Sequence, residues 1–256
     1  MTHFQPSLKH WVCWTLSCVL FGLTSPVRAE HAQADSLHVD FSAGLGLGGR
    51  AIERPTLEGS QRIGPGYFPA ADISVRAQAW PNQPIGLGFW LRYQTTLVDT
   101  AWEHPPRAPD NELRVRCHHV ELAAQPWLRP AADSGWSLGI GFGYSMRVFW
   151  PDVHNLQTPR QFITGPFLRP ELLLSGLGPI SLRLGPELFY ILTRDASLRA
   201  AIGDQPMIAL GGQLSIIADV SESFALELMY RESHVLLAPR FRDVERFATA
   251  LLTRRF

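Results

Sequence analysis

The chain has 256 residues, of which 46% are hydrophobic, and its 23 acidic residues match its 23 lysines and arginines in number. Lys9 is the only lysine, and without residues 1–29 the chain would carry 21 arginines against 23 acids. This balance argues against a nucleic-acid partner, which requires a basic surface. Beyond residue 29 Cys117 is the single cysteine, so neither an internal disulfide nor a cysteine metal cluster is expected. No cofactor is predicted.

The first 29 residues have the features of a secretory signal. Lys9 precedes an apolar stretch from residue 11 to 23, which Val27-Arg28-Ala29 follows as a cleavage site of small residues. We expect cleavage after Ala29, with residues 32–34 as the second choice. The apolar stretch is shorter than the ~20 residues of a spanning helix. The expected organisation is therefore a signal peptide (1–29), a short lead (30–35) and one domain (36–256).

From residue 37 onward, apolar residues repeatedly alternate with polar or small ones. A period of two predicts strands with one apolar face. Ten strands are predicted, at residues 36–49, 69–80, 85–98, 112–128, 135–149, 162–175, 179–192, 206–219, 223–235 and 245–256. Eight or twelve strands remain alternatives if one segment does not pair or a loop contains a hairpin.

The connections between these strands alternate between short and long. Short ones lie at residues 81–84, 129–134, 176–178 and 220–222, and long ones at 50–68, 99–111, 150–161, 193–205 and 236–244. Tight turns at one end and longer loops at the other are typical of a transmembrane antiparallel up-and-down β-barrel, the fold class we predict. The alternative is a soluble exported β-sandwich or lipid-binding barrel, which would turn its aliphatic face inward.

Aromatic residues gather near the two ends of the predicted strands. Amphipathic rings favour membrane–water interfaces, so we expect two outward-facing girdles. The predicted girdle residues are Tyr67, Tyr93, Tyr144, Tyr190, Tyr230, Trp127, Trp136 and Phe256.

The last strand resembles that of bacterial outer-membrane β-barrel proteins, which commonly end on phenylalanine preceded by apolar residues at every second place. Phe256, Leu252, Ala250 and Ala248 fit, whereas Arg254 departs from the pattern; a charge near the interface costs only ~0–1 kcal/mol. The resemblance implies a bacterial outer-membrane location, insertion by the barrel-assembly machinery, and outer-membrane lipids and lipopolysaccharide as partners. Rim arginines expected to meet lipopolysaccharide phosphates are Arg50, Arg62, Arg107, Arg160 and Arg240.

If the apolar face meets lipid, charged residues line the lumen. The predicted charge network comprises Asp72, Arg92, Glu121, Arg169, Glu171, Arg183 and Glu187. Counting across the short turns places Asp72 opposite Arg92, and Glu171 opposite Arg183. Opposite charges facing one another are mutually favourable, so we expect a largely plugged barrel with a structural, surface-interaction or limited small-solute role.

The alternative function is an outer-membrane enzyme. In size the predicted barrel resembles some outer-membrane enzymes, the omptin-like hydrolases and the lipid A-modifying enzymes, which act at the extracellular rim. His118, His119 and His234 are weak rim candidates here; no catalytic residue or metal ligand is assigned. The apolar phase changes at His118-His119, which predicts a β-bulge. A non-enzymatic role is favoured because no complete catalytic cluster is evident.

Overall fold

The structure is a computed structural model that describes residues 37–56, 59–63, 67–80, 83–97, 100–102, 113–130, 134–151, 161–194, 196, 199, 207–238 and 241–256. The predicted signal peptide (1–29) and lead (30–35) lie outside the described residues. In the described part, no helix is long and apolar enough to cross a membrane.

Ten long strands form the wall of the molecule: β1 (Leu37–Thr56), β3 (Tyr67–Ala79), β4 (Ile85–Thr96), β6 (Leu113–Leu128), β7 (Trp136–Pro151), β8 (Gln161–Leu177), β9 (Ile180–Ile191), β11 (Met207–Asp219), β12 (Phe224–Ala238) and β13 (Phe241–Arg255). Three short strands extend its edges: β2 (Gly59–Ile63) pairs with β1, β5 (Thr100–Trp102) with β6, and β10 (Thr193–Arg194) with β8.

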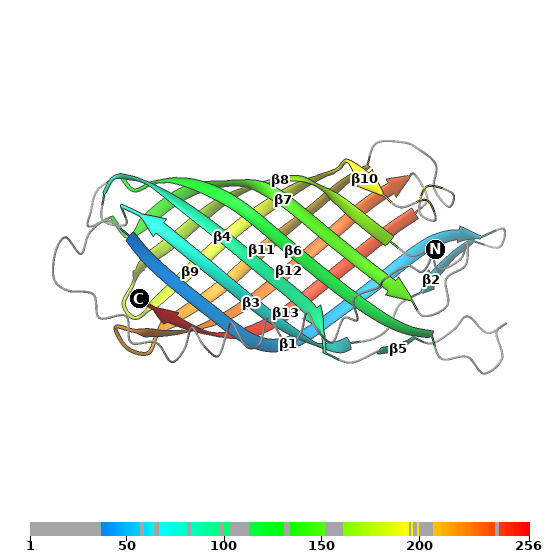
Figure 1. The fold of residues 1–256 in the computed structure, drawn as a ribbon, viewed down its shortest axis with the longest axis horizontal. Coiled ribbons are helices and arrows are strands. Elements are labelled where there is room, and N and C mark those ends of the chain that lie inside the picture. Colours follow the sequence, from blue (N-terminus) through cyan, green and yellow to red (C-terminus); the bar gives the residue numbers. More distant parts are fainter. Residues whose placement is uncertain are drawn as a thin grey trace, which may run out of the picture. The chain divides into compact units, whose positions relative to one another are not determined.

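Every long strand pairs antiparallel with its neighbours along the chain, and the first and last strands pair with each other. The ladder between β1 and β13 runs from Asp40–Arg255 to Glu53–Arg242. Figure 1 shows these two strands, blue and red, side by side, with the strands running obliquely. The chain is a closed ten-stranded antiparallel β-barrel.

All ten predicted strands are confirmed, and most of their ends lie within a few residues of the predicted ones. The largest differences lie at the end where the longer connections were expected, called here the long-loop end. There β1 continues to Thr56 and pairs with β2. Likewise, β12 and β13 extend to Ala238 and Phe241, so most of the loop predicted at 236–244 is strand.

The barrel has its apolar residues outside and its charges inside. Large apolar side chains are exposed around the wall, for example Leu45 (64%), Ile85 (68%), Leu122 (59%) and Leu228 (52%). Buried carboxylates and arginines alternate with them on the same strands, as with Glu121 beside Leu122 and Glu227 beside Leu228. A soluble barrel would have the reverse arrangement, because large exposed apolar surfaces mark contact with lipid or protein.

The predicted β-bulge at His118-His119 is wrong. The β6–β7 register is continuous there, with His118 paired to Val148 and His119 to Arg147. Cys117 and His119 both face inward and are 3% exposed. The apolar phase changes because apolar side chains such as Cys117 occupy inner-face positions toward the long-loop end, while the strand keeps its alternation.

The outward faces provide a first test of lipid contact. Leu184 lies near the middle of β9, and Leu192 lies on the same outer face two residues beyond Tyr190. We expect Leu184→Arg to lower the free energy of unfolding by about 2–4 kcal/mol in lipid vesicles, and Leu192→Arg by about 0–1 kcal/mol. Urea unfolding measures both. Equal losses would contradict a membrane centred on the middle of β9.

Candidate functional site

The centre of the barrel contains a buried group of charges, called here the central ionic cluster: Glu121, Glu187, Arg147, Arg169 and Arg231. Arg231 of β12 pairs with Glu121 of β6, five strands away in either direction around the ring. Arg169 of β8 binds both carboxylates, at 3.0 Å from Glu121. Arg147 of β7 lies 2.7 Å from Glu187. The cluster therefore joins opposite walls of the barrel.

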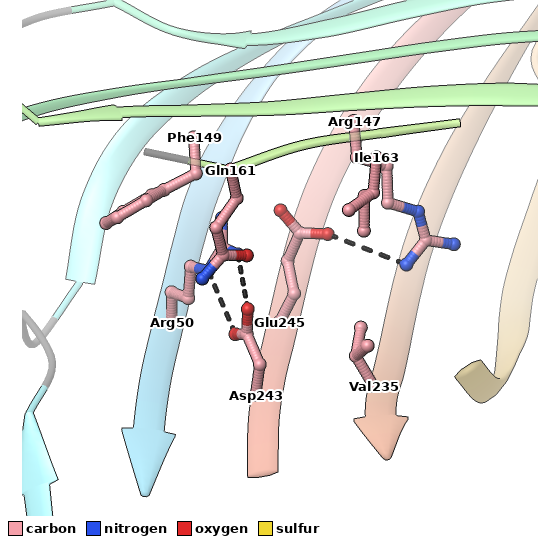
Figure 2. A pocket seen from close by; sticks show the side chains of 8 residues that line it. All are labelled: Arg50, Arg147, Phe149, Gln161, Ile163, Val235, Asp243 and Glu245. Atoms are coloured by element: carbon pink, nitrogen blue, oxygen red, sulfur yellow. Dashed lines mark hydrogen bonds and ion pairs between the residues drawn. The ribbon is translucent and has the colours of Figure 1, made fainter. Parts of the chain in front are cut away.

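Two further arginines also span the barrel. Arg92 of β4 binds Asp72 on β3 and donates to Gln213 Oε1 on the opposite strand β11, at 3.3 Å. Nearer the long-loop end, Arg50 of β1 pairs with Asp243 of β13 and donates to Gln161 Oε1 on the opposite strand β8, at 2.6 Å. Figure 2 shows this group around a small cavity with space for about one water molecule.

Toward the short-turn end, Arg183 of β9 joins two carboxylates. Its guanidinium lies 3.3 Å from Glu171 on β8 and 3.0 Å from Glu227 on β12. Arg76 on β3 lies 3.8 Å from the same Glu171. These contacts add a further group, nearer the short-turn end, in which charged side chains from separated strands meet inside the barrel.

The predicted register across two short turns is wrong by two residues, yet the predicted charges meet. Ala79 pairs with Leu87 rather than Ile85, so Ser74 lies opposite Arg92. Similarly, Leu173 lies opposite Arg183. A shift of two residues keeps every side chain on its face. The long guanidinium side chains then reach the carboxylates diagonally, which explains why Asp72 still contacts Arg92.

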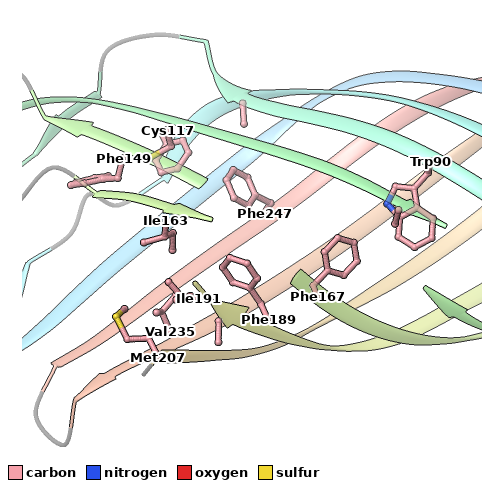
Figure 3. Close-up of a cluster of buried hydrophobic side chains, with 14 residues drawn as sticks. Trp90, Cys117, Phe149, Ile163, Phe167, Phe189, Ile191, Met207, Val235 and Phe247 are labelled. Atoms are coloured by element: carbon pink, nitrogen blue, oxygen red, sulfur yellow. The ribbon is translucent and has the colours of Figure 1, made fainter. Parts of the chain in front are cut away.

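On the long-loop side of the central ionic cluster, apolar side chains share the interior with the Arg50–Asp243 pair. The apolar layer consists of Phe68, Cys117, Phe149, Ile163, Phe189, Ile191, Met207, Val235 and Phe247 (Figure 3). Guanidinium groups stack on its rings: Arg50 lies 4.2 Å from the Phe149 centroid and Arg147 lies 4.6 Å from that of Phe189. Cation–π contact therefore connects the charges to the apolar layer.

A glycine makes room for the largest interior ring. A Cβ on Gly141 of β7 would lie 2.2 Å from the Trp90 ring. Trp90 is 5% exposed, and the guanidinium of Arg169 lies 5.6 Å from its centroid. The small residue thus allows an indole to fill the barrel beside the central ionic cluster.

Most predicted girdle residues lie on the outer face. Tyr67, Tyr144, Tyr190, Tyr230, Trp136 and Phe256 are all more than 40% exposed, and Tyr93 lies on the same face. Trp127 requires a correction, because it faces the lumen. Its ring occupies the space where a Cβ on Gly86 would lie, and Arg129 stacks 5.4 Å from its centroid. Trp127 and Glu121 are separated by an even number of positions in β6, so strand alternation places both side chains on the inner face.

The three rim histidines do not converge. His118 faces outward against Tyr93, whose hydroxyl lies 3.0 Å from Nδ1. His119 faces inward, 3.2 Å from Glu121 and 2.8 Å from the Ser145 hydroxyl. His234 faces outward on another strand, 2.6 Å from Glu232. Within the described chain, no group of three or more His, Cys, Asp or Glu residues could hold a metal ion.

Sequence reasoning missed a polar group on the outside of β12 and β13, called here the outer polar patch: Tyr230, Glu232, His234, Arg242 and Arg246. Glu232 accepts hydrogen bonds from Tyr230 and from Arg246, the latter at 3.1 Å. An Arg242 Nη2 atom lies 2.9 Å from His234 Nδ1. The sequence signal was the run Tyr230-x-Glu232-x-His234. It places three polar groups on the face of β12 that carries Leu226 and Leu228 earlier in the strand.

No protein-family model matches the sequence, and no curated protein matches it significantly. Solved structures with a similar arrangement include the translocator domain of the autotransporter NalP from Neisseria meningitidis (10% identity, 97% of each chain, TM-score 0.44). Others are the outer membrane protease OmpT from Escherichia coli (12%, 90% of this chain and 99% of that chain, 0.44) and Ail of Yersinia pestis (10%, 85% and 99%, 0.37). These likenesses say nothing about what this chain binds or catalyses.

The central ionic cluster provides a test of stability. Glu187→Ala removes one carboxylate from three buried arginines, so we expect a loss of about 3–5 kcal/mol in the free energy of unfolding. Glu222→Ala, in the exposed turn between β11 and β12, is the control and should change it by less than about 0.5 kcal/mol. Urea titration measures both; a loss below about 1 kcal/mol for Glu187→Ala would contradict a tightly coupled cluster.

The orientation of β6 is tested by thiol labelling. Cys117 should resist a maleimide in the folded barrel and react in urea, because it lies inside the apolar layer. In a Cys117→Ala/Arg116→Cys variant, the outward-facing thiol should react in the folded barrel. Peptide mass spectrometry identifies the labelled position. Rapid labelling of Cys117 in the folded barrel would instead support a bulge that turns it outward.

Proposed function

We propose that this protein is an integral outer-membrane β-barrel that does not conduct ions and that acts through the segments at its long-loop end. Support for the membrane location comes from the exposed aliphatic side chains around the wall and the outward tyrosines near the long-loop end. In this assignment the long-loop end is extracellular, and the barrel-assembly machinery inserts the chain.

Support for a sealed lumen comes above all from one observation, the contact between Arg231 and Glu121 across the full width of the barrel. Ten strands enclose only slightly more space than eight, a number at which side chains fill the interior. Arg92 reaches its opposite strand directly beside the Arg231–Glu121 pair, and Arg50 does so nearer the long-loop end. An ion would have to displace these pairs, and each displaced charge would lose its partner in a buried site.

A non-enzymatic role is preferred to that of a hydrolase acting at the rim. A catalytic site requires a nucleophile, a base and an orienting group within hydrogen-bond reach. His118 and His234 face outward on separate strands, and Ser233 faces inward onto Arg147. His119 does lie beside Ser145 and Glu121, but both contacts use Nε2 while Nδ1 faces Arg231, so no carboxylate orients the ring. The side chains of His119, Ser145 and Glu121 are at most 3% exposed, which keeps a substrate away from them. Function is therefore assigned to surface interaction and to the structural role of the barrel.

Planar-bilayer recording of the refolded protein tests this proposal. The wild type should insert without current steps. A Glu121→Ala/Arg231→Ala double variant removes the pair across the barrel without leaving either charge alone, and it should show discrete current steps. The control is Leu122→Ala/Leu228→Ala, which changes outward-facing positions on the same two strands and should stay silent.

Each outcome has a definite meaning. Steady conductance by the wild type would overturn the sealed lumen and favour a narrow solute path. A double variant that inserts but stays silent would show that the central ionic cluster is not what closes the barrel.

A further inference from the structure

The outer polar patch interrupts an otherwise apolar outer face. On β12, Leu226 and Leu228 are exposed on the short-turn side of the patch, and so are Leu45 and Leu47 on β1, the strand that pairs with β13. The patch begins at Tyr230, one of the outward tyrosines, and continues toward the long-loop end. Its polar groups therefore lie where acyl chains give way to lipid head groups, if the barrel spans a membrane.

The geometry of the patch links two guanidinium groups to one carboxylate, Arg246 directly and Arg242 through His234. Glu232 is the backbone partner of Arg246, and it also lies 2.6 Å from His234. Arg246 reaches Glu232 at 3.1 Å, while the side chain of Arg246 remains 43% exposed. Arg242 approaches the far nitrogen of the same imidazole. Contacts with Glu232 and His234 thus order both arginines before any ligand arrives.

Among its described side chains, the patch has two arginines and one carboxylate. Arg246 binds this carboxylate, whereas Arg242 contacts His234 and has Glu53 of β1 as its backbone partner. Glycines flank the Arg246–Glu232 pair on both neighbouring strands, because Gly49 is the partner of Arg246 and Gly212 is the partner of Glu232. The two glycines add no side chain beside the pair, and the Arg246 side chain is 43% exposed, so an anionic group can reach Arg246. Val244, which lies between the two arginines on β13, is buried.

We propose that the outer polar patch binds the phosphorylated head group of an outer-leaflet lipid, in this membrane lipopolysaccharide. Guanidinium groups bind phosphate through two parallel N–H donors each, which suits Arg242 and Arg246. The tyrosine and the exposed leucines below would hold the lipid's acyl chains against β12 and β1. This assignment corrects one sequence-based candidate: Arg50 faces the lumen with Asp243 and is 7% exposed.

The inference depends on the membrane location proposed above but not on a sealed lumen. The two can be tested separately, since the patch and the central ionic cluster lie on opposite faces of the wall. Flotation of the refolded protein with vesicles tests the membrane location alone, and conductance tests the lumen alone.

The experiment is a titration of the refolded full chain in detergent with diphosphorylated lipid A, read by native mass spectrometry. We expect one or more lipid A molecules to bind the wild type. Arg242→Gln/Arg246→Gln should weaken binding at least tenfold while leaving the electrophoretic mobility of the folded barrel unchanged. Arg254→Gln, on the same face of β13 at its other end, is the matched control and should bind like the wild type.

Two further ligands separate the sources of phosphate. Dephosphorylated lipid A should bind at least tenfold more weakly than the diphosphorylated form, and inorganic phosphate should not compete at millimolar concentration. Equal binding of the two lipids, or equal loss in the Arg254→Gln control, would overturn the proposal. Competition by inorganic phosphate would overturn its assignment to a lipid. If the double variant does not fold, Arg242→Gln alone provides the same comparison.

Discussion

The pairing of arginine with carboxylate inside the barrel is the constraint on which the rest of the structure depends. Placing charges in an enclosed interior costs several kcal/mol per ion unless each has well-placed partners. Glu121 and Glu187 each meet two or more guanidinium groups, so neither relies on one contact. Planar guanidinium groups with five donors can bridge several strands in this way, which ammonium groups on flexible stems do less well.

This constraint explains the distribution of the other interior residues. Glycines such as Gly141 make space beside Trp90, and the rings of Phe149 and Phe189 lie under guanidinium groups that point away from water. Charges therefore occur along most of the lumen, and apolar side chains join them toward the long-loop end. The outer face carries the opposite pattern, aliphatic in the middle and polar beyond Tyr230.

Sequence periodicity was sufficient to predict the strands and their faces, because alternation is a local property. It could not determine register: the hairpins at Ala79 and Leu173 are shifted by two residues, which leaves every face unchanged and so is invisible in the pattern. The errors at Trp127 and His118 have a common source. Both assume that apolar residues always face outward, whereas this interior accepts an indole and a layer of phenylalanines. The outer polar patch was missed because Arg242 comes from the strand extension at 241–244, predicted as loop, so its place beside His234 was not foreseen.

The contact between Glu121 and Arg231 joins residues 110 positions apart in the chain. Such a pair gives no stability to a partial sheet, because its two members meet only once β1 has found β13. Until then the charges must remain hydrated, so an open sheet carries water along its inner face. Closure of the wall and drying of the interior are thus one event, which makes assembly a late, highly cooperative step and folding slow for a chain of this length.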